Sequence, residues 1–419
     1  MSQAAPRLQA RVPGAALAVV VAGVAAALHL GKLSPAVPAL QASLGIGLVE
    51  AGFLLSLVQV AGMTLGIFVG LAADTIGLRR SMLAGLVVVT CASLLGGLVG
   101  SSGIGGTQAL HLLLVLRGLE GVGFLLAVMP GPGLIRTMSA PSTEKAALGL
   151  WGAYMPLGVA LALLLGPALI AWAGWPGWWW ALSAVSAAAA VGVALAVPAD
   201  DKPRAAAAPT PWSARLADTL RAEGPWTLAL AFAVYSAQWM AVIGFLPAIY
   251  ADAGVPDGWN AALTAIAAAM NIVGNVAGGR LLQKGVSPER LLRWGFVVMA
   301  LGSVAAFAQI GQVGDALGLP PSLRYLAVCA FSLGGGVIPA TLFMLAVRMA
   351  PGPSTVSTTV GMMQQASSLG QFVAPPVVAW IAHRAGGWQW TWVVTLACSL
   401  AGMALAARIA PSSPRAGTA

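Results

Sequence analysis

The chain has 419 residues, of which 59% are hydrophobic and 8% are charged. Because soluble proteins carry roughly 25% charged residues, this composition excludes a water-soluble globular protein. The formal net charge of +9 would suit a nucleic-acid partner, so the placement of the basic residues has to decide between nucleic acid and membrane.

Apolar runs recur along the chain at the length of about 20 residues that a helix needs to cross a hydrocarbon core of about 30 Å. Met82 to Gln108 and Trp178 to Ala199 are two runs without any charge. We therefore expect an all-α membrane protein with twelve transmembrane helices. The expected spans are 14–38, 48–72, 81–101, 109–132, 146–171, 178–198, 225–249, 260–281, 291–313, 323–348, 357–381 and 390–409.

The basic residues concentrate in alternate loops. If the N-terminus is cytoplasmic, most lysines and arginines lie on the cytoplasmic side, as the positive-inside rule requires. This placement explains the net charge without a nucleic acid and predicts a multi-pass protein of a bacterial inner membrane, with both termini cytoplasmic. A signal peptide is the alternative for the first span, but Gly14 to Leu30 exceeds a typical hydrophobic region and no A-x-A cleavage pattern follows.

Cys91, Cys329 and Cys398 lie in different spans, and neither they nor the histidines show the spacing of metal ligands. No nucleophile motif and no nucleotide-binding loop occurs in the sequence. We therefore expect no metal, no cofactor, no catalytic residue and no enzymatic activity.

The sequence repeats itself at a shift of 212 residues, which places IRTMSAPST (135–143) over VRMAPGPST (347–355). Chance matches between apolar helices share Ala and Leu, whereas these segments share Arg and Pro-Ser-Thr. We expect two six-helix, pseudo-symmetric bundles in the same orientation, at 1–198 and 225–419, joined by a cytoplasmic linker at 199–224. Within the linker, ARLADTLRAE is expected to form a short helix on the membrane surface. Transporters with this kind of repeat bind their solute near the midplane, between the halves.

Two motifs resemble signatures of the major facilitator superfamily, and the resemblance extends over essentially the whole chain. GLAADTIGLRR (70–80) is similar to the loop signature G-x-L-x-D-R-x-G-R-R, with Thr75 and Leu78 replacing the usual basic residues. RGLEGVG (117–123) resembles the fourth-span signature R-x-x-Q-G-x-G, with Glu120 in place of glutamine. The resemblance implies two halves that rock about a central cavity, with a conformational gate at the first motif. The matching gate residues are Gly70, Asp74, Gly77, Arg79 and Arg80.

The fifth span separates subclasses of this superfamily. Drug/proton antiporters typically carry G-x-x-x-G-P-x-x-G-G there, but here Gly166 and Pro167 are followed by Ala-Leu-Ile-Ala, so the second glycine pair is missing. LWGAYMPLG (150–158) and GMMQQASSLGQFVAPP (361–376) look more like the cyanate/nitroimidazole transporter branch.

Arg117 and Glu120 lie three residues apart in an apolar run, so they share one face of a helix. A charge at the centre of a membrane helix costs roughly 2.5–3.5 kcal/mol on insertion scales, which makes it a functional candidate. In the functional interpretation, Arg117 binds an anionic substrate, and a proton on Glu120 releases Arg117 for that substrate. In the structural interpretation, the two form a permanent ion pair that locks span 4 against span 1 or 5.

His29 and Lys32 share a face in the outer half of span 1. If Lys32 faces inward, it joins Arg117 in making the outward cavity electropositive; the alternative is that it snorkels to the outer surface. An unperturbed histidine titrates near physiological pH, so His29 is a candidate site residue, although a lone histidine is more often a packing residue.

The second half supplies amides in place of charges. We expect Gln238, Asn271 and Gln365 to face the cavity, and Tyr154 of span 5 to offer its hydroxyl to a ligand. The alternative for each is structural, because amides often bridge membrane helices and a tyrosine hydroxyl can bind a backbone carbonyl. The G-x-x-x-G spacing that ends at Gly70 is expected to pack span 2 closely against another helix.

Together these observations predict a secondary active transporter that moves a small organic or inorganic anion across the inner membrane by alternating access, with proton symport. A proton-coupled exporter of drugs or metabolites is the alternative. The expected partners are the small anionic substrate, protons and the lipid bilayer, with no nucleic acid, and the chain is expected to act as a monomer.

Overall fold

The computed structural model describes residues 12–46, 48–104, 106–200, 211–308, 319–385 and 387–409, and these form helices with no strand among them. Parts of the expected linker and ninth span, and both chain termini, lie outside the described residues. The helices of the N-terminal half are α1 (Gly14–Gly31), η1 (Ser34–Ala36), α2 (Val37–Leu44), α3 (Leu48–Ile76), α4 (Leu78–Ser101), α5 (Gly106–Val128), α6 (Gly131–Met138), α7 (Glu144–Gly152) and α8 (Tyr154–Ala196). The helices of the linker and the C-terminal half are α9 (Trp212–Arg221), α10 (Glu223–Asp252), α11 (Asp257–Gln283), α12 (Pro288–Phe307), α13 (Pro321–Met349), η2 (Pro353–Thr355), α14 (Val356–Ala385), η3 (Trp388–Trp390) and α15 (Thr391–Ala407).

Ten helical segments of the described residues are long and apolar enough to cross a membrane. One of them contains α8, which runs for 43 residues and bends at Gly174, where φ is 70° and ψ is 172°. At 1.5 Å per residue α8 would measure about 65 Å, roughly twice the thickness of a hydrocarbon core. α14 covers the expected eleventh span but is rich in Ser, Thr and Gln, and it is not among the ten. The all-α membrane class is confirmed, whereas the count of twelve spans and their division into two bundles stay predictions.

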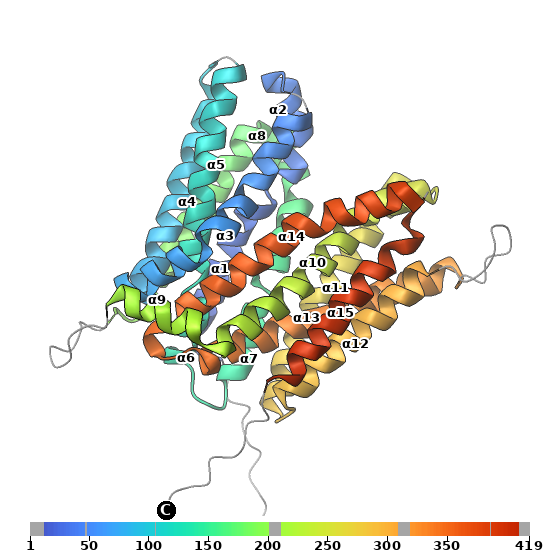
Figure 1. Ribbon diagram of the computed structural model, residues 1–419. Coiled ribbons are helices and arrows are strands. Elements are labelled where there is room, and N and C mark those ends of the chain that lie inside the picture. The colour runs from blue at the N-terminus through green and yellow to red at the C-terminus, as the bar shows by residue number, and fades with distance from the viewer. Residues whose placement is uncertain are drawn as a thin grey trace, which may run out of the picture.

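The helices of the two halves converge at the end of the molecule that carries α6, α7 and α9, and they diverge toward α2 (Figure 1). We call the end with α6, α7 and α9 the linker end. The most extensive packing between the halves joins α3 to α14 and α7 to α11. These two helix pairs therefore hold the halves together.

Glycines allow both helix pairs to approach closely. A Cβ atom at Gly66 of α3 would lie 2.7 Å from the Cβ of Gln365 and from the carbonyl oxygen of Gly361 in α14. A Cβ atom at Gly149 of α7 would lie 2.5 Å from the Cα of Gly279 in α11. The two contacts are related by the 212-residue shift to within one residue. The close packing expected from the glycine spacing is confirmed, because small residues let membrane helices gain backbone contact.

Candidate functional site

Four ionisable side chains singled out in the sequence meet inside the N-terminal half, and we call them the charge cluster: His29, Lys32, Arg117 and Glu120. Lys32 directly follows α1, whereas Arg117 and Glu120 lie three residues apart on α5. All four side chains are buried, with exposed fractions between 0% for Lys32 and 3% for Arg117. The alternative in which Lys32 snorkels to the outer surface is therefore wrong in this structure.

Glu120 connects the members of the charge cluster. Its Oε1 accepts a hydrogen bond from the Nζ of Lys32, and its Oε2 accepts one from Arg117 at 2.9 Å. The Nδ1 of His29 lies 3.7 Å from Oε1 and is buried without a hydrogen-bond partner among the described residues. Two basic side chains therefore share a single carboxylate.

Arg117 also satisfies backbone groups of two other helices. It donates to the carbonyl oxygens of His29 at 2.5 Å and Leu30 at 3.3 Å, both in the last turn of α1, and to that of Leu54 in α3 at 3.3 Å. Carbonyls in the last turn of a helix have no partner within it, and a cation there also stabilises the helix dipole. Arg117 thus ties α5 to α1 and α3, as the structural interpretation requires.

The remaining partners of the charge cluster come from α4 and α8. Lys32 donates to the Oγ of Ser93 at 3.2 Å, and its Nζ lies 4.4 Å from the centre of the Trp179 ring. The Nε2 of His29 lies 3.2 Å from the Oγ of Ser186. These partners all belong to the N-terminal half, so direct contact between the charge cluster and a solute stays a prediction.

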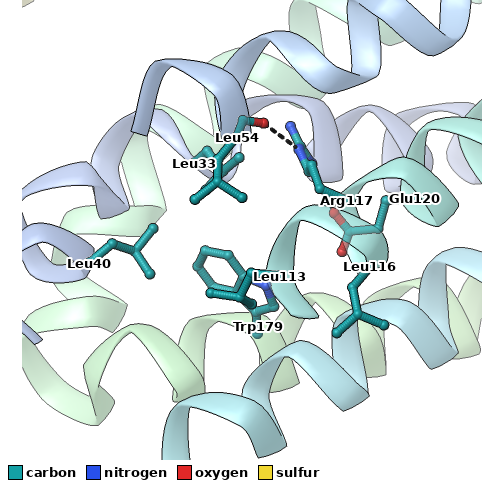
Figure 2. Close-up of a pocket in the computed structure, with 8 residues that line it drawn as sticks. All are labelled: Leu33, Leu40, Leu54, Leu113, Leu116, Arg117, Glu120 and Trp179. Atoms are coloured by element: carbon teal, nitrogen blue, oxygen red, sulfur yellow. Dashed lines mark hydrogen bonds and ion pairs between the residues drawn. The ribbon is translucent and has the colours of Figure 1, made fainter. Parts of the chain in front are cut away.

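A small cavity lies beside the charge cluster (Figure 2). Arg117 and Glu120 form its polar wall, and leucines and a tryptophan form the rest. Its lining residues are Leu33, Leu40, Leu54, Leu113, Leu116, Arg117, Glu120 and Trp179. The cavity volume of about 10 Å³ is close to the minimum that holds one water molecule. A larger occupant needs the surrounding side chains to move.

Tyr154 belongs to an aromatic contact that crosses from one half to the other. Its ring stacks on Trp151 with the centroids 4.5 Å apart, and both rings lie 6.5 Å from Phe343 of α13. Phe343 in turn lies 5.6 Å from Phe232 of α10. Sequence reasoning missed Trp151, Phe232 and Phe343, because an aromatic residue in an apolar span gives no sign of whether it faces lipid, core or the other half.

Two of the three expected cavity amides connect helices within the C-terminal half. Asn271 donates to the hydroxyl of Tyr235 at 3.0 Å and to the carbonyl oxygen of Ser332 at 3.1 Å. Gln238 accepts a hydrogen bond from the hydroxyl of Ser399 at 2.9 Å, and its Nε2 is buried without a partner among the described residues. These contacts fit the helix-bridging interpretation, and a cavity role for either amide stays a prediction.

The third expected amide reaches the other half. Gln365 of α14 accepts a hydrogen bond from the backbone nitrogen of Ile67 in α3 at 3.0 Å. Further along the same helix pair, Gln59 donates to Gln371 at 3.1 Å. Gln365 therefore lies where α3 and α14 meet, and its contact with a solute is untested.

Asp74 makes a charged contact between the halves at the linker end. Its carboxylate accepts hydrogen bonds from the backbone nitrogens of Ser357 at 3.0 Å and Thr358 at 2.7 Å, and from the Thr358 hydroxyl at 2.7 Å. Ser357 and Thr358 form the first turn of α14, where backbone N–H groups lack helical partners and the helix dipole is positive. The aspartate thus fastens α3 to the N-terminus of α14.

Gly70, another expected gate residue, packs against the backbone of Ser357 in α14, whereas Gly77, Arg79 and Arg80 contact an acid that sequence reasoning missed. The carboxylate of Asp200 accepts from the backbone nitrogens of Arg79 and Arg80, both at 2.9 Å. Gly77 has φ of 108°, and a Cβ there would lie 2.7 Å from the Cγ of Asp200, so both backbone conformation and space favour glycine. The only sequence signal was an acidic pair directly after the sixth expected span.

The linker supplies a guanidinium to the first motif. Arg215 of α9 donates to the hydroxyl of Thr75 at 2.6 Å, at a position where the family signature has a basic residue. α9 also packs against η2 and α14 of the C-terminal half. The loss of a basic residue at Thr75 is therefore offset by an arginine from a different segment.

Comparison with known proteins supplies the family. Residues 15–354 match the model of the Major Facilitator Superfamily. The cyanate transport protein CynX of Escherichia coli (strain K12) is 25% identical over 390 residues, covering 91% of this chain and 93% of that protein. The fucose:proton symporter FucP of E. coli, in the outward conformation, matches with a TM-score of 0.74 at 15% identity, covering 94% of this chain and 97% of that one. The human organic anion transporter MFSD10 (TETRAN) matches with a TM-score of 0.74 at 14% identity, covering 94% and 99% of the two chains.

Proposed function

Because the chain belongs to the major facilitator superfamily, we propose that it is a secondary active transporter that carries a small monovalent anion together with a proton. Transport across a membrane follows from the family and from the apolar helices. The solute, the coupling ion and the location in a bacterial inner membrane are the proposal, as are a monomeric state and twelve spans in two bundles.

The composition of the charge cluster is the observation that carries the anion. Lys32 and Arg117 share the single carboxylate of Glu120, so the cluster has a charge of +1 when Lys32 is protonated and His29 is neutral. In a buried, ion-free setting this charge is poorly screened. At about 10 Å and an effective dielectric constant of about 20, it attracts a monovalent anion by about 2 kcal/mol. An anion that passes near α1 and α5 would therefore be favoured over a neutral or cationic solute.

Two further observations favour a small anion. One relative, 25% identical over most of both chains, is named a cyanate transport protein, and cyanate is a monovalent anion of three atoms. The cavity beside Arg117 and Glu120 has a volume of about 10 Å³, so a three-atom anion needs a small movement of the lining side chains, whereas a drug-sized solute needs a far larger opening. Both observations support a small anion over drug-sized molecules as the solute.

We place the linker end in the cytoplasm, where the positive-inside rule puts the basic loops. In that orientation the cytoplasmic side is closed by the α3–α14 and α7–α11 contacts and by Asp74. The proposed gate consists of Gly70, Asp74, Gly77, Arg79 and Arg80. Opening toward the cytoplasm requires Asp74 to leave α14, and closing the opposite end would bring the two halves together around Tyr154, Gln238, Asn271 and Gln365, the proposed solute contacts.

The test is uptake of radiolabelled cyanate into liposomes that contain the purified protein, with the interior more alkaline than the exterior. We expect accumulation that collapses when the pH gradient is removed. Lys32→Gln and Arg117→Gln should reduce cyanate uptake strongly, whereas Arg384→Gln, at an exposed site outside the charge cluster, should leave it unchanged. Full uptake in both cluster variants would refute the anion site. Extrusion of dyes with no anion uptake would instead favour the exporter.

A further inference from the structure

We propose that Lys32, and not Glu120, carries the coupled proton by alternating between ammonium and neutral amine. The inference rests on the proposed function, because it requires an anion and a proton to move together. The sequence analysis assigned proton coupling to Glu120; the contacts within the charge cluster favour Lys32 instead.

The first argument is a charge count. An arginine side chain does not lose its proton in proteins, so Arg117 contributes +1 throughout. A proton added to Glu120 would give the buried cluster a charge of +2, carried by Lys32 and Arg117 without a counter-ion. A proton removed from Lys32 leaves the Arg117–Glu120 pair, joined at 2.9 Å, with a net charge of zero. Because an unpaired buried charge costs several kcal/mol, only the lysine can change its protonation and leave a neutral cluster.

The second argument is the direction of the hydrogen bonds. Both carboxylate oxygens of Glu120 face donors: Oε1 faces the Nζ of Lys32 and Oε2 faces the guanidinium of Arg117. While Lys32 is charged, a proton on either oxygen would point at a side chain that can donate hydrogen bonds but cannot accept one. A neutral amine at Lys32, in contrast, keeps two N–H groups, which suffice for its hydrogen bonds to Glu120 and to Ser93. Deprotonation of Lys32 thus breaks no hydrogen bond.

Among the described residues, three other ionisable side chains surround Lys32. The ionisable side chains that face it are Glu120 and Arg117 from α5 and His29 from α1; α4 presents the hydroxyl of Ser93 and α8 the ring of Trp179. His29 is the neutral base beside Lys32 and Glu120 that can accept the departing proton. If its Nε2 carries hydrogen and donates to Ser186, the unpartnered Nδ1 is a free lone pair 3.7 Å from the oxygen that binds Lys32.

The transport step then balances without any redox change. On the outer side, the amine lone pair of Lys32 takes one proton, and the resulting +1 charge favours one monovalent anion. On the inner side, the anion and the proton leave together, and the Arg117–Glu120 pair returns to neutrality. One proton therefore moves with each anion, and the overall step transfers no net charge across the membrane.

The experiment separates proton coupling from anion binding in liposomes containing Lys32→Arg, which keeps the positive charge but cannot release it. We measure exchange of external radiolabelled cyanate for internal unlabelled cyanate, which needs no proton release, and accumulation driven by a pH gradient. Lys32→Arg should keep exchange and lose at least about tenfold in accumulation, whereas the matched control Lys284→Arg, at an exposed site in the linker end, should keep both.

Undiminished accumulation by Lys32→Arg would overturn the assignment of the proton to Lys32. If Lys32→Arg is not recovered as folded protein, Glu120→Gln decides the question. The proposal expects its remaining transport to be driven by the pH gradient still, and exchange without accumulation in Glu120→Gln would overturn the proposal. Absence of cyanate exchange in the unaltered protein would contradict the proposed function itself, so the two failures are distinguishable.

Discussion

Replacement of Asp74 by asparagine should open the protein at the linker end. The carboxylate accepts three hydrogen bonds from the first turn of α14, two of them from Thr358 to one oxygen. Asparagine is neutral and offers one acceptor oxygen, so even when that oxygen keeps both hydrogen bonds from Thr358, the amide nitrogen faces the N–H of Ser357. Hydrogen bonds to charged groups contribute about 1.5–3 kcal/mol each, and water at the linker end would replace part of the loss. We expect a net loss of about 3 kcal/mol, which shifts the conformational equilibrium by about 150-fold toward a form that is open at the linker end.

The measurement uses spin labels on the two halves at exposed positions of the linker end, Leu195 at the end of α8 and Arg290 in α12, after replacement of the three native cysteines. Asp74→Asn should add a population with a longer distance between the labels. Glu144→Gln is the matched control, because it removes a carboxylate at the same end that makes no hydrogen bond to α14 in the described part of the chain. Identical distance distributions for Asp74→Asn and the unaltered protein would refute the view that this carboxylate holds the closed form.

Three further outcomes follow from the contacts. Gly66→Leu should prevent the close approach of α3 to α14, because even a Cβ at this position would lie 2.7 Å from atoms of α14. The maximum rate of cyanate uptake should fall at least about tenfold, and a normal rate would show that transport does not need this helix contact. Arg215→Ala should weaken closure by about 1 kcal/mol, or about fivefold by the same distance measurement, with Arg221→Ala as control and Thr75→Arg as a rescuing second substitution. Lys32→Gln should lower the affinity for cyanate in exchange assays by about 20-fold, since the +1 charge supplies about 2 kcal/mol at about 10 Å; an unchanged affinity would show that no solute approaches so near.

The polar residues show where prediction from sequence succeeds and where it stops. Arg117, Glu120 and Lys32 were recognisable because a charge in an apolar run needs a partner wherever it lies. Their partners were not recognisable, since Ser93, Trp179 and the carbonyl of Leu54 carry no sequence signal that distinguishes them from packing residues.

The gate shows the same division. The motif predicted a gate at Asp74, and the glycine spacing predicted close packing of the second span against another helix. That the acid binds the first turn of α14, and that Arg215 of the linker reaches Thr75, follows only from helices brought together by folding.

The sequence by itself determined the class of the protein, because apolar length dictates membrane helices; loop charge and the internal repeat predict their orientation and their division into two halves. Only the tertiary structure decided which charged side chains pair with each other, because this depends on which donors face which acceptors. The sequence shows that Lys32, Arg117 and Glu120 lie in apolar spans. That both basic side chains bind the one carboxylate, buried between α1, α4, α5 and α8, follows only from the packing of these helices.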